Sequence, residues 1–175
     1  NFTFPHIGNV GTNKEDHESD KIWTRGVIFN SEITSPSNYR SLNHLDKWLK
    51  KNKVVGLTGI DTRSLTNFIR DNGAPKGTIS INKKGNFNIK KLTNNSQKWP
   101  GLNGLDLAKE VTTKKTYKWA GYKTWKKGIG YKKSYVNKLK IIAIDFGIKK
   151  NILRYLSDYD CEVEVVSCNI SADEI

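Results

Sequence analysis

The chain has 175 residues, of which 36% are hydrophobic and 27% charged, and its formal net charge is +13. This length suffices for one ordinary domain, or for one small domain and part of another. Its apolar runs are only a few residues long, whereas about 20 residues are needed to cross a bilayer, so a membrane-spanning helix is excluded. The first residues lack a signal-peptide pattern and there are only two cysteines, so we expect a soluble protein of the reducing cytoplasm.

The basic excess suggests a polyanionic partner such as nucleic acid, but the residue types weaken this interpretation. Only five of the 30 basic residues are Arg, the side chain that binds phosphates and guanine in bidentate fashion. An A+T-rich genome would also produce an excess of Lys, Asn and Ile. A solvated Lys-rich surface is therefore favoured over a functional one, although both interpretations stay open.

Residues 4–16 read "FPHIGNVGTNKED" and form the first segment of interest. Gly8 and Gly11, flanked by Asn and Thr, can present backbone N–H groups to an anion and can adopt left-handed conformations. A phosphate-binding P-loop would need Lys and Ser or Thr after the second glycine, and a dinucleotide site would need G-x-G-x-x-G. Neither pattern is present, so a structural loop is favoured over a ligand-facing one.

Short strands and amphipathic helices are predicted next along the chain. A strand is expected at residues 27–29, then a turn at 35–38, then a helix that begins with Ser41 as N-cap and presents an apolar stripe. A buried strand follows in "VVGLTGI", and a second helix is expected from the N-cap Asp61 to Asn72-Gly73.

Residues 76–140 give weaker and more mixed signals of secondary structure. "KGTISIN" is typical of a strand and "NIKKLTNNSQKW" of a weaker helix. Residues 111–140 hold ten Lys and no Asp or Glu, interleaved with Trp and Tyr, a composition that single-strand nucleic-acid binders use. The alternative that we favour is an antiparallel strand pair, "TYKWAGY" with "KTWKKGIGY", followed by a Lys-rich linker.

The character of the sequence changes after Lys138. "KLKIIAIDFG" is a continuous apolar strand, "IKKNILRYLSDYD" is an amphipathic helix, and "CEVEVVSCN" is a second strand. This order predicts a βαβ unit that begins a parallel sheet, with a domain boundary near residues 133–138.

No set of residues forms a convincing nucleophile and base. The three histidines are scattered, no metal-ligand spacing occurs, and Cys161 and Cys168 are expected to pack as small hydrophobic side chains. "DFG" at 145–147 lacks the context of a kinase. Asp145 and Lys149 follow the first strand of the predicted sheet, where open α/β folds bind ligands, so a site-facing or interface role competes there with a purely structural turn.

Five strings occur in an order that resembles one family. They are "PHIGNVGTNKED", "SNYRS", "DTRSLTNFIRDNGA", "PGLNGLDLAKEVT" and "IDFGIKKNILR". Together they resemble the small, glutamine-hydrolysing subunit of carbamoyl phosphate synthetase, over residues 1–175 with a poor match at 114–138. The nucleic-acid-binding domain remains as the alternative function.

The resemblance implies a mixed α/β fold. Residues 1–136 would be the family's swivelling β/β/α domain, incomplete at its start, and residues 137–175 would begin a truncated class I glutamine amidotransferase domain. The catalytic Cys, His and Glu of the family would lie beyond Ile175, so no catalytic or substrate-binding residue is assigned within 1–175. We therefore expect the chain to be a fragment without glutaminase activity of its own.

The resemblance also implies partners. The small subunit would dock on the large synthetase subunit, which would bind ATP and Mg²⁺ and convert bicarbonate and ammonia to carbamoyl phosphate for arginine and pyrimidine biosynthesis. This chain itself would bind no cofactor, metal, nucleic acid or membrane. Interface or positioning roles are expected for His6, Asn9 and Asn13 near the glutamine pocket, and for Asp145 and Lys149 near the subunit interface.

Overall fold

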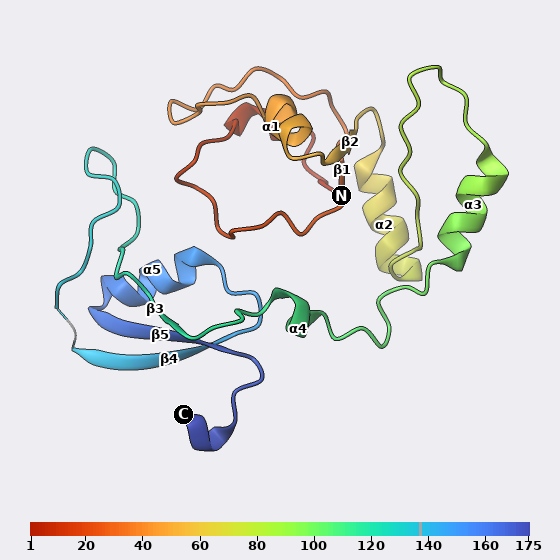
Figure 1. Ribbon diagram of the computed structural model, residues 1–175. Coiled ribbons are helices and arrows are strands. Elements are labelled where there is room, and N and C mark those ends of the chain that lie inside the picture. Colours follow the sequence, from red (N-terminus) through yellow and green to blue (C-terminus); the bar gives the residue numbers. More distant parts are fainter. Residues whose placement is uncertain (137) are drawn as a thin grey trace. The chain divides into compact units, whose positions relative to one another are not determined.

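The computed structural model describes residues 1–136 and 138–175, which fall into two compact units of mixed α/β structure (Figure 1). The first unit comprises residues 1–17 and 21–103, and the second comprises residues 18–20 and 104–175. The expected boundary at 136/137 falls on residue 137, which lies outside the described residues. Residues 104–136 cluster with the second unit because their strand pairs with its sheet, and the family's own domain boundary stays a prediction.

A small parallel sheet and one helix form the core of the first unit. Strand β1 (Gly26–Ile28) pairs in parallel with β2 (Val55–Leu57), and helix α1 (Leu45–Lys51) lies between them in the sequence. The buried residues of this core are Val27, Phe29, Leu49 and Val54. The predicted strands and helix are confirmed, but β2 is not buried along its length, because Leu57 is 40% exposed.

Helix α1 starts later than its apolar stripe predicts. The backbone of Leu42 and Asn43 donates to Thr12 O at 2.9 and 3.0 Å, and Thr12 N donates to Asn43 O at 2.9 Å. This antiparallel bridge holds the segment extended, so Ser41 cannot be the N-cap. His44 is the N-cap instead, and its Nδ1 accepts from Asp46 N at 3.2 Å.

Two further helices complete the first unit. Helix α2 (Thr62–Asn72) is capped by Asp61, whose carboxylate accepts from Ser64 N at 2.9 Å, and it ends at Gly73, as predicted. Helix α3 (Ile89–Lys98) is also confirmed. The strand predicted at 76–82 was wrong: this segment pairs with no strand, and Thr78 Oγ1 instead donates to Leu92 O of α3 at 3.3 Å.

The second unit is built on the predicted βαβ motif. Strands β4 (Leu139–Asp145) and β5 (Cys161–Ser167) pair in parallel over their whole lengths, and helix α5 (Lys150–Asp158) connects them. Leu153, Val163 and Val165 form its buried centre, each contributing about 1.5–3 kcal/mol through burial. The pattern of the sequence favours Ile152 and Tyr155 as core residues of this helix, but both are exposed, whereas Arg154 is buried.

The Lys-aromatic tract folds onto this unit. Helix α4 (Leu107–Val111) precedes β3 (Tyr117–Lys118), which pairs antiparallel with β5 to give the strand order β3-β5-β4. The partner predicted for "TYKWAGY" was therefore wrong. Further on, isolated antiparallel bridges join Tyr122 to Lys133 and Lys126 to Gly130. Neither is the predicted pairing, because Lys133 lies beyond "KTWKKGIGY" and Lys126 and Gly130 both lie within it. A 3-10 helix, η2 (Ala172–Glu174), follows β5, with Ser171 as its N-cap.

Candidate functional site

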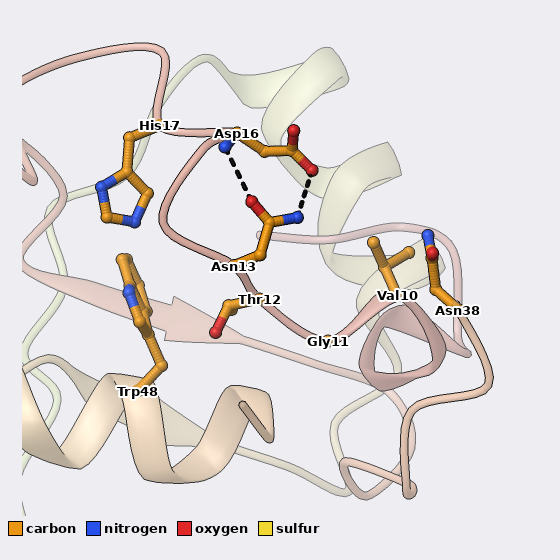
Figure 2. A pocket seen from close by; sticks show the side chains of 8 residues that line it. All are labelled: Val10, Gly11, Thr12, Asn13, Asp16, His17, Asn38 and Trp48. Carbon is orange, nitrogen blue, oxygen red and sulfur yellow. Dashed lines mark hydrogen bonds between the residues drawn. The ribbon is translucent and has the colours of Figure 1, made fainter. Parts of the chain in front are cut away.

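The opening loop lines two adjoining hollows in the first unit. The smaller, of about 170 Å³, is the pocket of Figure 2, and the larger has a volume of about 470 Å³. Both hollows are lined by Thr12, Asn13, His17 and Trp48. Part of the loop around the 3-10 helix η1 (Ile7–Val10) thus faces a cavity, so the ligand-facing alternative of the sequence analysis has a structural basis.

Gly11 and Asn13 give the loop its path. Gly11 has φ +64°, and a Cβ atom there would overlap Ser41 Oγ and lie 2.7 and 2.8 Å from the Cβ atoms of Ser41 and Pro36. Asn13 Oδ1 accepts from the backbone N–H groups of Glu15 and Asp16 at 2.8 and 2.9 Å, and its Nδ2 donates to Asp16 Oδ2 at 2.5 Å (Figure 2). Such an Asx turn fixes the backbone by hydrogen bonds within the loop itself.

Arg40 holds the loop from outside. Its Nη2 lies 2.8 Å from Asp16 Oδ1 and 3.2 Å from Glu15 Oε2, and its side chain is only 19% exposed. Sequence reasoning quoted the "SNYRS" string but assigned Arg40 no role. The signal that would have found it is charge complementarity: a scarce Arg in one loop and a Glu-Asp pair in another.

The other two loop candidates lie elsewhere. Asn9 Oδ1 accepts from Thr34 Oγ1 at 2.6 Å, and Asn9 O accepts from Ser37 N at 2.9 Å, so this residue ties the loop to residues 34–37. His6 is exposed, and its ring meets the ring of Phe4 edge-on at 6.0 Å. Neither lines the two hollows, so only Asn13 of the three candidates does.

The wall of the larger hollow is aromatic and basic. The rings of His17 and Trp48 meet edge-on with centroids 6.2 Å apart, and they face each other across the pocket in Figure 2. Lys47 and Lys51 come from α1 and Lys14 comes from the opening loop. The lining of this hollow contains no Asp or Glu among the described residues, which makes it attractive to anions.

Asp145 lies at the carboxyl end of β4 in the second unit, where it organises the turn into α5. Its Oδ1 accepts from Gly147 N and Ile148 N at 2.8 Å each, and its Oδ2 accepts from Thr113 N at 2.6 Å. The carboxylate is buried and three backbone donors surround it. The geometry therefore supports the structural-turn alternative for Asp145, whereas its role at an interface stays a prediction.

Lys149 is the N-cap residue of α5, but its exposed side chain makes no capping hydrogen bond. Glu18 caps the helix instead: its Oε2 accepts from Asn151 N at 2.9 Å and its backbone oxygen accepts from Lys150 N at 3.1 Å. Glu18 Oε1 also accepts from the buried Arg154 at 3.0 Å. Negative charge at a helix N-terminus is stabilising, so this distant residue completes the first turn of α5. Sequence reasoning missed the contact, because nothing local links residues so far apart.

Of the two cysteines, Cys161 agrees with the sequence analysis, whereas Cys168 is only partly buried. Cys161 is buried on β5, and its Sγ packs near Tyr159 O at 3.8 Å, as expected for a thiol that serves as a small hydrophobic side chain. Across residues 1–136 and 138–175 no three His, Cys, Asp or Glu side chains are grouped so as to hold a metal ion. Over the same residues no helix combines the length and hydropathy that a bilayer crossing requires.

Comparison with known proteins identifies the family. The family model for the carbamoyl-phosphate synthase small chain, CPSase domain, matches residues 1–79. Carbamoyl phosphate synthase small chains from Bartonella henselae, Agrobacterium fabrum and Bradyrhizobium diazoefficiens are 49%, 48% and 45% identical to this chain. These alignments cover 99–100% of this chain and 45% of each relative, so the chain spans a little under half the length of the curated relatives it matches. The chain belongs to the carbamoyl phosphate synthase small-chain family.

Proposed function

We propose that the protein acts in its full length as the glutamine-hydrolysing subunit of a carbamoyl phosphate synthase. The observation that carries this proposal is the 45–49% identity to small chains of that enzyme along nearly all of the chain. The large subunit is the partner, and it would bind ATP and Mg²⁺ while this chain binds neither. The nucleic-acid-binding alternative has no support among these relatives, and the pathway and cytoplasmic location expected above remain part of the proposal.

The glutaminase step would proceed through a Cys thiolate that attacks the glutamine side-chain amide. A thioester forms, ammonia leaves, and water then releases glutamate. We assign this chemistry to residues outside 1–175, as the resemblance implies. The burial of Cys161 and its position within a strand support the view that it is not the nucleophile.

Within the present residues we propose two structural contributions. Residues 137–175 would begin the amidotransferase domain, and residues 1–136 would form the swivelling domain. His6, Asn9 and Asn13 would then shape the contact near the glutamine pocket, and Lys149 would face the large subunit. The hydrogen bonds of Asn9 and Asn13 support a rigid loop, and the exposed side chain of Lys149 supports a role in binding a partner.

The test is a comparison of glutamine and ammonia as nitrogen donors in the complex of full-length subunits. The proposal expects ATP-dependent carbamoyl phosphate formation from both donors, with only the glutamine reaction lost when the small subunit is omitted. Lys149→Met should leave glutamine hydrolysis intact but raise the ratio of glutamate released to carbamoyl phosphate formed. Lys140→Met, an exposed lysine of the same unit, serves as the matched control.

The opening loop is tested in the same assay. His6→Ala and Asn9→Ala should each reduce glutamine-dependent synthesis or subunit binding while leaving ammonia-dependent synthesis unchanged. Unchanged glutamine-dependent rates and unchanged binding in both variants would remove the loop from the proposal. A complex that uses ammonia alone would contradict the proposed glutaminase function itself.

A further inference from the structure

We propose that the larger hollow beside α1 is a binding site for a small phosphorylated molecule that carries an apolar or aromatic group. Three lysines supply the positive charge, and the ring of Trp48 supplies the apolar wall. The inference uses only contacts within the first unit and does not depend on the proposed glutaminase function.

The charge of the hollow is not compensated by the protein. Within the described residues the ammonium groups of Lys14, Lys47 and Lys51 have no ion-pair or hydrogen-bond partner, and no carboxylate lines the hollow. Lys50, on the same helix, differs because its Nζ pairs with Asp46 at 2.6 Å. Like charges at positions i and i+4, as in Lys47 and Lys51, destabilise a helix slightly, and a bound anion would relieve that repulsion.

The size and polarity of the hollow fit a phosphorylated small molecule. Its volume of about 470 Å³ falls in the range of small-molecule sites. A phosphate monoester carries up to two negative charges and several acceptor oxygens. It can therefore accept hydrogen bonds from three ammonium groups and balance more of their charge than a single carboxylate can. The side-chain amide of Asn43 has no partner in the part of the chain that the structure describes and adds a further donor.

The floor of the hollow is already ordered. The Thr12–Asn43 bridge, the Asx turn of Asn13 and the ion pairs of Arg40 hold the backbone on both sides of it. Because a preorganised site loses little conformational entropy when it binds, even a small ligand can gain net affinity there.

The experiment is a titration of the full-length protein with phenyl phosphate, followed by the indole Nε1–H signals of its tryptophans in a ¹H–¹⁵N spectrum. The Trp48→Phe variant identifies the Trp48 signal. We expect this signal to shift in a saturable manner, with a Kd on the order of 1 mM that rises with salt concentration.

Single substitutions test the lysines. Lys47→Gln and Lys51→Gln should each weaken phenyl phosphate binding about two- to fivefold, as expected for exposed charge pairs. Lys50→Gln is the matched control on the same helix and should leave the affinity unchanged, because Lys50 does not line the hollow. Benzoate, with the same ring and a single charge, should bind at least several-fold more weakly than phenyl phosphate.

Three results would overturn the proposal. The first is a Trp48 signal that does not move at about 10 mM phenyl phosphate, well above the expected Kd. The second is an equal loss of affinity in Lys50→Gln and Lys47→Gln, which would indicate non-specific attraction to a basic surface. The third is displacement of phenyl phosphate by polyglutamate at far lower concentration, which would make the hollow a docking face for an acidic protein segment.

Discussion

The described residues contain two strand–helix–strand motifs with parallel strands, and the two are built in opposite ways. In the first unit, strands of three residues are joined by α1, and the connection from β1 to α1 spans residues 29–44. In the second unit, strands of seven residues are joined by α5, and the connection from β4 to α5 spans only residues 146–149. The first motif is therefore held largely by its loops and the second by its sheet.

This difference indicates which connection can carry binding residues. The long connection of the first unit carries Asn38, Arg40 and Asn43, which line or brace the hollows beside the opening loop. The short connection of the second unit is closed by the three hydrogen bonds to Asp145. Loops carried by a rigid scaffold are where proteins usually place binding residues, and the connection from β1 to α1 is such a loop.

The largest expected effect comes from Gly11→Ala, which tests how far the first unit depends on its loops. The residue has φ +64° and the added methyl group would meet Ser41 and Pro36, so we expect a loss of about 3 kcal/mol in the free energy of unfolding. Urea denaturation measures it. Gly59→Ala is the control, because Gly59 has φ +78° but nothing within 4 Å, and it should cost only about 1 kcal/mol. Equal losses would show that the close approach to Ser41 is unimportant.

The corresponding test of the second unit is Asp145→Ala. Removing the carboxylate leaves three backbone N–H groups without their acceptor, so we expect a loss of about 2–3 kcal/mol, measured by urea denaturation. Asp145→Asn should cost less, because its amide oxygen can still accept from Gly147 and Ile148. Asp20→Asn, which removes a largely exposed partner of Lys150, should cost at most about 1 kcal/mol. A loss no greater than that of Asp20→Asn would contradict the role of Asp145.

Glu18→Gln should have the next largest effect. It separates the contribution of a residue distant in sequence from that of the local sheet. Arg154 would lose its charged partner while remaining buried, and α5 would lose its negative cap, at a cost of about 1–2 kcal/mol. Faster hydrogen exchange of the Asn151 amide would locate the effect. Glu15→Gln provides the control, because Arg40 keeps Asp16 as a partner. Unchanged exchange at Asn151 would mean that solvent caps the helix equally well.

Local signals in the sequence predicted elements that depend on neighbouring residues. Helix α2 begins at its Asp61 cap and ends at Gly73 as the residues indicate, and the apolar run of β4 forms the expected parallel strand. Where partners lie far apart in the sequence, the prediction failed. The Thr12–Asn43 bridge delays the start of α1, and residues 76–82, expected as a strand, form none, while Thr78 donates to Leu92 of α3.

The candidate site was predictable to a similar extent. The opening loop was singled out from its Gly, Asn and His residues, and Asn13 does line the hollows. Trp48 belongs to the apolar stripe of α1 and Lys51 to its last turn, and both also line the larger hollow. A helical pattern shows which face of a helix is apolar, but not which loop lies against the edge of that face. Arg40 and Glu18 were missed for the same reason: ion pairs between distant segments leave no periodic pattern.

The smallest expected effect concerns a charge cluster that fixes the turn between α5 and β5. Asp160 has φ +58° and accepts from Lys123 Nζ at 2.8 Å and Ser134 Oγ at 2.9 Å, and Lys138 Nζ lies 3.3 Å away. The hydrogen bonds from these groups, that from Lys123 being the strongest, lower the pKa of Asp160 from 3.8 to about 2. Asp160→Asn removes the charge but keeps a residue that tolerates this backbone conformation.

The pH dependence of this variant follows from the direction of the shift. A carboxyl group whose pKa is lower in the folded state stabilises the fold at pH values above its unfolded pKa of 3.8, and that contribution is lost as the pH falls towards about 2. The Tm difference between the unmodified chain and Asp160→Asn should therefore be constant from neutral pH to about pH 5 and shrink towards zero near pH 2. Calorimetric scans over this range measure it. A Tm difference that stays constant down to pH 2 would mean that Asp160 acts through its shape and hydrogen bonds alone, and that the turn does not rely on its charge.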